Sequence, residues 1–209
     1  MLRRWLTSLL LVLMLAVLAG ECAYLYWRER QPRENAFEYY IVTLSREAGM
    51  DPFLIRAVIS RESKFDPLCH GADDERGLMQ VMPNVGQMWA KANKIENYHD
   101  EDLYDPVTNI RVGTWYLKRS IGLWMKDDVD DPVVFALAEY NAGRTNARRW
   151  VDPLNPRDHV AFLDRITFPG TRKYVDVIMS RREQFAKDFA DNRFYRDAVA
   201  SHPTASATP

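Results

Sequence analysis

The sequence predicts an all-α protein, and two observations carry this prediction. First, no stretch alternates apolar and polar residues in the way that is typical of a half-buried strand, and no internal repeat stands out. Second, an aspartate followed by a proline precedes three runs with helical apolar spacing. Aspartate is a good N-cap and proline suits the first helical position, so each pair predicts a helix start. The three pairs are Asp51-Pro52, Asp105-Pro106 and Asp131-Pro132.

Further helices follow from apolar residues spaced three and four apart. The expected helices are residues 35–48, ended by Gly49; the Pro52 helix that carries Glu62; residues 83–93; the Pro106 helix; the Pro132 helix, ended by Gly143; a short helix near 159–165; and residues 171–189. Tyr40 is expected on the apolar face of the first helix, and the third helix bears Val85, Met88 and Trp89. Residues 66–76 and 94–104 are predicted loops, and residues 144–168 a mixed stretch.

The N-terminal residues 1–30 predict a signal anchor or a signal peptide. Residues 5–27 are mostly apolar, follow Arg3 and Arg4, and are long enough to cross a bilayer, which needs ~20 residues. We favour an uncleaved anchor over a cleaved signal peptide. A lipid-modified Cys22 is a third interpretation, although Glu21 departs from the usual motif. Under all three interpretations the domain predicted over residues 31–190 is exported. The tail 191–209 is predicted to be disordered, and its last residues, 202–209, are small, polar and proline-containing.

Composition excludes several classes of function. The net charge of −1 gives no field that would attract nucleic acid, and no nucleic-acid motif is present. Of the two cysteines only Cys69 lies in the predicted domain, so no disulfide can form within it. No cofactor motif and no strong metal-ligand spacing occur, so neither a cofactor nor a metal is expected. The acidic middle and basic later part of the chain are expected to be solvated surfaces; the alternative is a basic rim that holds anionic wall polymer.

Glu62 is the candidate catalytic residue. It follows Val58 and Ile59 at helical spacing and therefore lies on the apolar face of its helix. Burial disfavours the charged form of a carboxyl group and raises its pKa, as a general acid at neutral pH requires. The alternative is that Glu62 belongs to a last helical turn that faces solvent.

Four short motifs, in this order and spacing, carry a resemblance to a known family. They are Glu62-Ser63, Gly77-Leu78-Met79-Gln80, Tyr140-Asn141-Ala142-Gly143 and Thr171-Arg172-Lys173-Tyr174-Val175. The chain resembles the catalytic domain of the soluble-type peptidoglycan lytic transglycosylases, which are similar in fold to goose-type lysozyme. The resemblance covers about residues 45–182 and implies a lysozyme-like helical domain.

The resemblance also implies a reaction and a site. Enzymes of this family cleave the β-1,4 bond between N-acetylmuramic acid and N-acetylglucosamine in peptidoglycan without water, and leave 1,6-anhydromuramic ends. It assigns Glu62 as the single catalytic acid and base. The motif residues expected to bind substrate are Ser63, Met79, Gln80, Tyr140, Asn141 and Tyr174. Glu75 is added to them because it lies two residues before Gly77, although it is not part of the family pattern. The expected partners are glycan strands, and the membrane through the N-terminal helix. The expected location is the periplasmic side of the inner membrane.

The chain departs from the family pattern at three places. Gly71 stands where many members have a serine, Gly170 stands where a glutamate is common, and Glu75 lies in an acidic loop. Glu75 as a second carboxylate would permit ordinary hydrolysis, so a hydrolytic muramidase is one alternative function. A wall-binding scaffold with little catalysis is another.

Overall fold

The computed structural model describes residues 12–22, 24–25 and 34–191. The chain divides into two compact units, Met1–Ala36 and Phe37–Pro209. In the first unit residues 12–22 are helical. None of the helices in the described ranges is both long enough and apolar enough to span a bilayer. Much of the N-terminal segment predicted over residues 1–30, and all but Asp191 of the predicted tail, lie outside the described residues.

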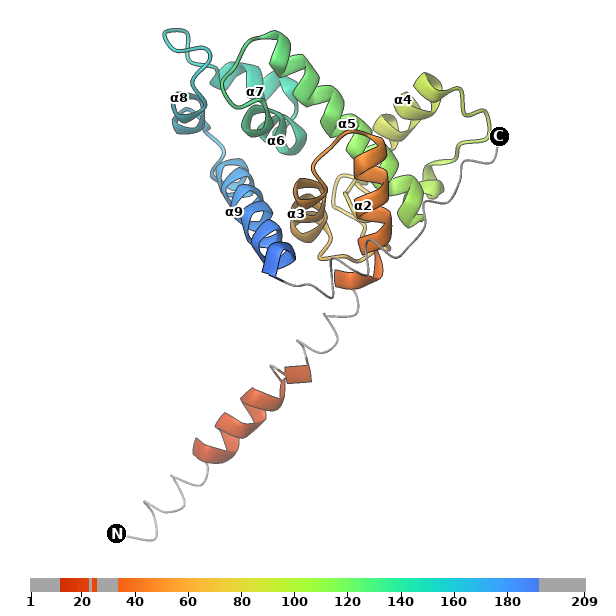
Figure 1. The fold of residues 1–209 in the computed structure, drawn as a ribbon, viewed down its shortest axis with the longest axis vertical. Helices are drawn as coiled ribbons and strands as arrows, with labels where there is room; N and C mark the ends of the chain where they lie inside the picture. The colour runs from red at the N-terminus through yellow and green to blue at the C-terminus, as the bar shows by residue number, and fades with distance from the viewer. Residues whose placement is uncertain (1–11, 23, 26–33, 192–209) are drawn as a thin grey trace. The chain divides into compact units, whose positions relative to one another are not determined.

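The regular elements in the described part of the second unit are helices, joined by turns and loops (Figure 1). Its elements are α2 (Glu38–Glu47), α3 (Pro52–Glu62), α4 (Pro83–Asn93), the 3-10 helix η1 (Asp100–Tyr104), α5 (Pro106–Lys126), α6 (Pro132–Ala142), α7 (Arg144–Trp150), α8 (His159–Asp164) and α9 (Pro169–Asp191). Over residues 34–191 the extended pairing is limited to two isolated bridges, which join Arg76 to His70 and to Val81. The all-α prediction is therefore confirmed for the described residues.

The three predicted aspartate-proline helix starts are confirmed by their hydrogen bonds. The carboxylate of Asp51 accepts a hydrogen bond from the backbone N–H of Phe53 at 2.9 Å. Asp105 caps α5 through the N–H of Thr108 at 2.8 Å, and Asp131 caps α6 in the same way. Each bond satisfies a backbone donor that the first turn of a helix leaves unpaired.

α3 lies at the centre of the core. Its residues Ile55, Val58 and Ile59 have no exposed surface. α9 packs along α3, while α6 packs on both α5 and α9 (Figure 1). The fold thus brings the C-terminal end of α3, which carries Glu62, beside α9 in the three-dimensional structure.

The expected apolar face of α2 was wrong at Tyr40, and Met88 of α4 is exposed as well. Tyr40 is 40% exposed, because the buried stripe of α2 runs through Glu38, Ile41 and Ser45 and leaves Tyr40 to one side. Met88 is 41% exposed, because α4 buries Val85 and its small residues instead. In both helices apolar residues are more numerous than the buried stripe can hold, and sequence spacing does not choose among them.

Two short helices were not predicted. η1 falls in the expected polar loop 94–104, and α7 begins immediately after Gly143 in the expected mixed stretch.

Arg148 of α7 pairs with Asp127 at 2.6 Å, and Arg157 pairs with Asp128 at 2.8 Å. These pairs join the basic later part of the chain to its acidic middle, which favours ion-paired, solvated surfaces over a basic rim.

Candidate active site

Glu62 is the last residue of α3 and faces a cleft with a volume of about 440 Å³. The hydroxyl of Tyr174 on α9 donates a hydrogen bond of 2.6 Å to Oε1 of Glu62. Burial raises the pKa of Glu62 to about 7, and the nearby charge of Glu75 adds to this rise; the Tyr174 hydrogen bond and Arg61 act in the opposite direction. Glu62 therefore exchanges its proton near neutral pH, as a residue that acts in turn as acid and base requires.

The motif at residues 77–80 reaches the cleft through Gln80 and is fixed by Asn109 of α5. The side chain of Asn109, which has no exposed surface, accepts a hydrogen bond from the N–H of Met79 at 2.7 Å. It also donates to the carbonyls of Arg76 (2.7 Å) and Leu103 (2.6 Å). Gly77 has a φ of +73°, and a Cβ there would overlap Leu103 and Asn109. Only glycine fits this turn, which places the next three residues.

Met79 and Tyr140 together connect the loop to α6. The side chain of Met79 has no exposed surface and packs against Gly113 and Thr114. Its backbone carbonyl accepts a hydrogen bond of 2.9 Å from the hydroxyl of Tyr140, which lines the cleft. The substrate-binding assignment of Met79 stays a prediction; in this structure its side chain contributes to the core and its carbonyl positions Tyr140.

Gln80 and Asn141 both line the cleft and both have one end of the side chain fixed. Nε2 of Gln80 donates to the carbonyls of Cys69 (3.1 Å) and Gly77 (2.9 Å). This orientation leaves Oε1 of Gln80 as a hydrogen-bond acceptor. Oδ1 of Asn141 accepts a hydrogen bond of 2.7 Å from the hydroxyl of Thr171. Its amide N–H groups are therefore the donors that a ligand can use.

The remaining predicted residues differ in their access to the cleft. Glu75 lines it, whereas Ser63 and Tyr174 are not among the lining residues. The hydroxyl of Ser63 donates to the carbonyl of Ile59 at 3.2 Å, and Tyr174 is 1% exposed. In this structure Tyr174 acts on Glu62, not on a ligand surface, and a role of Ser63 in substrate binding stays a prediction.

Several lining residues were not predicted, among them Tyr116 of α5 and Glu139 of α6. Glu139 is 1% exposed and accepts hydrogen bonds from Trp124 Nε1 (2.8 Å) and from Arg144 (2.7 Å). A usable signal was present, because Glu139 interrupts the apolar run of α6 just as Glu62 follows the apolar face of α3. The ring of Tyr116 lies 5.7 Å from that of Tyr140.

The comparisons with known proteins agree with this geometry. The family model described as the Transglycosylase SLT domain matches residues 39–158. The soluble lytic murein transglycosylase of Escherichia coli (strain K12) is 31% identical over 150 residues, which are 71% of this chain and 21% of that protein. The membrane-bound lytic murein transglycosylase C of Shigella sonnei is 31% identical over 110 residues, 50% of this chain and 30% of that protein.

A solved structure is similar as well. The 70 kDa soluble lytic transglycosylase of Escherichia coli superimposes with a TM-score of 0.62 at 28% identity, over 71% of this chain and 24% of that one. The helical fold with a half-buried glutamate at a cleft thus defines a lysozyme-like domain. This chain belongs to the transglycosylase SLT domain family. It spans about a quarter or less of the length of the first curated relatives that it matches.

Proposed function

We propose that this protein is a peptidoglycan lytic transglycosylase, which cleaves the β-1,4 bond between N-acetylmuramic acid and N-acetylglucosamine without water. The observation that carries the proposal is Glu62, a half-buried carboxyl group with a pKa of about 7 at the edge of a cleft in an SLT domain. The names of the relatives, which are murein transglycosylases, support the same substrate class.

In the first step Glu62 acts as a general acid. The Tyr174 hydroxyl donates its hydrogen bond to Oε1 of Glu62, so the acidic proton is carried by Oε2. That proton passes to the glycosidic oxygen as its bond to C1 of the muramic acid residue breaks. The departing N-acetylglucosamine keeps the proton as its 4-hydroxyl, and positive charge develops at C1 of the muramic acid.

In the second step the ionised Glu62 acts as a general base. The 6-hydroxyl of the same muramic acid residue attacks C1, and its proton returns to Glu62. One C–O bond has broken and one has formed, Glu62 is again protonated, and no water is consumed. Oε1 of Gln80 is placed to accept the N–H of an acetamide group, and Asn141 offers amide donors on the same cleft.

The test is mass spectrometry of purified peptidoglycan after digestion with the detergent-solubilised full chain, with its Glu62→Gln variant and with Glu96→Gln as a control. Glu96 is an exposed glutamate outside the cleft lining. We expect anhydromuropeptides from the native chain and the control, and none from Glu62→Gln. Products with reducing ends would identify a hydrolytic muramidase instead. Glycan binding with no turnover would identify a wall-binding scaffold.

We further propose that the N-terminal segment exports the domain and holds it at the inner membrane, facing the periplasm. The apolar composition of residues 5–27 supports this, as do the exposed apolar side chains of helical residues 12–18. Fractionation of cells that express the full chain, or the chain without residues 1–30, tests the proposal. Recovery of the full chain in the soluble fraction after carbonate extraction would contradict the anchor.

A further inference from the structure

Residues 71–75 form a tight turn that folds the side chain of Glu75 back over Gly71. The backbone N–H of Gly71 donates to the carbonyl of Glu75 at 2.7 Å. The N–H of Asp73 donates to Oε2 of Glu75 at 3.0 Å. Asp74, with a φ of +70°, makes the reversal in direction. The Glu75 carboxylate is therefore oriented by the backbone of its own turn.

This carboxylate lies where a side chain of residue 71 would lie. A Cβ built on Gly71 would overlap Oε2 of Glu75 and would be 2.9 Å from Oε1 of Gln80. No side chain fits at position 71 while Glu75 has this conformation. The family resemblance leads one to expect a serine at position 71, so in this chain the glutamate fills the space of the serine side chain and brings an acceptor of its own.

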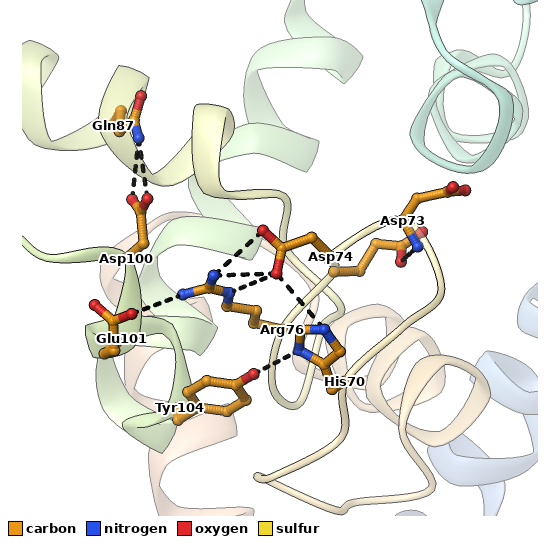
Figure 2. Close-up of polar contacts among 9 residues, drawn as sticks. His70, Asp73, Asp74, Arg76, Gln87, Asp100, Glu101 and Tyr104 are labelled. Atoms are coloured by element: carbon orange, nitrogen blue, oxygen red, sulfur yellow. Dashed lines mark hydrogen bonds and ion pairs between the residues drawn. The ribbon is translucent and has the colours of Figure 1, made fainter.

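The outer side of the same loop is fixed to η1 and its surroundings (Figure 2). Arg76, with a side chain that is 14% exposed, pairs with Asp74 at 3.0 Å and with Glu101 at 3.5 Å. Nδ1 of His70 lies 2.6 Å from the hydroxyl of Tyr104. These contacts hold the loop on both sides of Glu75, so the position of its carboxylate relative to the cleft is defined before a ligand arrives.

Glu75 and Gln80 then present two acceptor oxygens to the same part of the cleft. Nε2 of Gln80 is used by two backbone carbonyls, which directs Oε1 toward Gly71. Within residues 34–191 no lysine or arginine forms an ion pair with Glu75. The N–H of Asp73 uses only part of the acceptor capacity of the Glu75 carboxylate, so an N–H or O–H group of a bound sugar can donate to it as well.

We propose that Glu75 is a substrate-binding residue of this cleft, which replaces a side chain at position 71 and accepts a hydrogen bond from an N–H or O–H group of the glycan beside Gln80. This inference rests on the proposed function. It differs from a role of Glu75 as the base of a hydrolase, because here the carboxylate holds the sugar and takes no proton from water. Its negative charge has a second effect, since it raises the pKa of Glu62.

Binding is measured first, in the full chain carrying Glu62→Gln, so that turnover does not interfere. The probe is the tetrasaccharide of β-1,4-linked N-acetylglucosamine, followed by calorimetry. We expect Glu75→Ala to weaken binding about ten-fold, as the loss of a charged hydrogen bond does. Gly71→Ser with Glu75→Ala should recover part of the affinity, because the serine hydroxyl then fits the vacated space. Glu96→Gln is the matched control and should bind as the parent does.

The outcomes separate the possible roles of Glu75. Unchanged binding in Glu75→Ala overturns the proposal. A loss that the added serine does not reduce also overturns the proposal, because it assigns Glu75 to loop structure alone. Thermal unfolding of each variant identifies a folding defect. If Glu75→Ala has such a defect, Glu75→Gln replaces it; weaker binding is then expected, and unchanged binding overturns the proposal. With Glu62 intact, reducing-end products that disappear in Glu75→Gln would show a hydrolytic base. Failure of the proposed function would give a different result: the native chain would release no anhydro products, while the variants would keep the same ranking of glycan affinities.

Discussion

Glu38 and Glu62 are two carboxyl groups in different regions of the same helical unit, the first buried and the second half-buried, and loss of solvent raises the pKa of both to about 7. Glu38 is 8% exposed at the start of α2, where it pairs with Arg56 at 2.9 Å. The guanidinium of Arg56 in turn lies 4.5 Å above the ring of Phe185. Glu62 instead receives its hydrogen bond from the neutral hydroxyl of Tyr174 and lines the cleft.

The difference shows that a raised pKa alone does not identify a catalytic acid. Both groups hold a proton near neutral pH, but the proton of Glu38 is enclosed between α2 and α3 with a cation beside it. Only Glu62 combines the raised pKa with access to a cleft and with a donor that holds one oxygen and leaves the other available. Access, together with the neighbouring groups, separates the functional carboxyl from the structural one.

The largest expected effect is on turnover. Glu62→Gln should lower the rate of glycan cleavage by a factor on the order of 10³, because an amide neither donates the acid proton nor accepts one back. Glu38→Gln, the same change at the other buried carboxyl, should keep more than about half of the native rate if its role is structural. Initial rates of anhydromuropeptide release check this. A similar loss of cleavage rate in both variants would contradict the distinction between a catalytic Glu62 and a structural Glu38.

The next effect is on the pH dependence of stability. Each carboxyl has an ordinary pKa of 4.5 and a folded-state pKa of about 7, so the folded protein binds more protons than the unfolded chain between these values. Stability from each group is thus fully present below pH 4.5 and is lost as the pH rises through 7, by up to about 3 kcal/mol per group.

Denaturant unfolding between pH 5 and pH 8 measures this slope. We expect Glu62→Gln and Glu38→Gln each to reduce the slope, and Glu62→Gln to be more stable than the native protein at pH 8, where the native carboxylate is charged and only partly solvated. A slope that neither variant changes would mean that neither carboxyl is protonated in the folded protein near neutral pH.

The smallest expected effect concerns Tyr174. Its hydrogen bond lowers the pKa of Glu62, so Tyr174→Phe should raise that pKa and move the alkaline limb of the rate profile to higher pH. The maximal rate should fall about ten-fold, because Oε1 of Glu62 is no longer held. Tyr98→Phe, a matched change at a tyrosine outside the cleft lining, should leave the limb in place. A shift to lower pH in Tyr174→Phe would contradict this account.

Sequence patterns predicted most of the helices because helix starts and helix faces depend on residues that are close together in the chain. The capping carboxylates of Asp51, Asp105 and Asp131 act within three residues, so reading them required no tertiary contact. The same holds for the position of Glu62 on the apolar face of α3. The short helix α7 and the 3-10 helix η1 were missed, because few apolar residues mark them and contacts with other elements support them.

The site residues likewise include some that local sequence predicted and some that depend on tertiary contacts. The sequence indicated which residues matter through four separated motifs, but not what each of them does. Met79 matched a family motif yet has its side chain in the core, whereas Glu139 and Tyr116 line the cleft without having been predicted. These outcomes depend on how α5 and α6 pack, which residue spacing along one helix does not specify.

From the sequence alone came the helical class, the helix starts, the candidate acid and the resemblance to lytic transglycosylases, because helix periodicity, capping chemistry and ordered motifs are properties of neighbouring residues. Only the tertiary structure decided that Tyr174, 112 positions away, donates to Glu62. It alone showed Asn109 fixing the Gly77 turn and Glu75 filling the space beside Gly71. Burial and hydrogen-bond partners set the pKa of a carboxyl group, and both arise only when distant segments pack together.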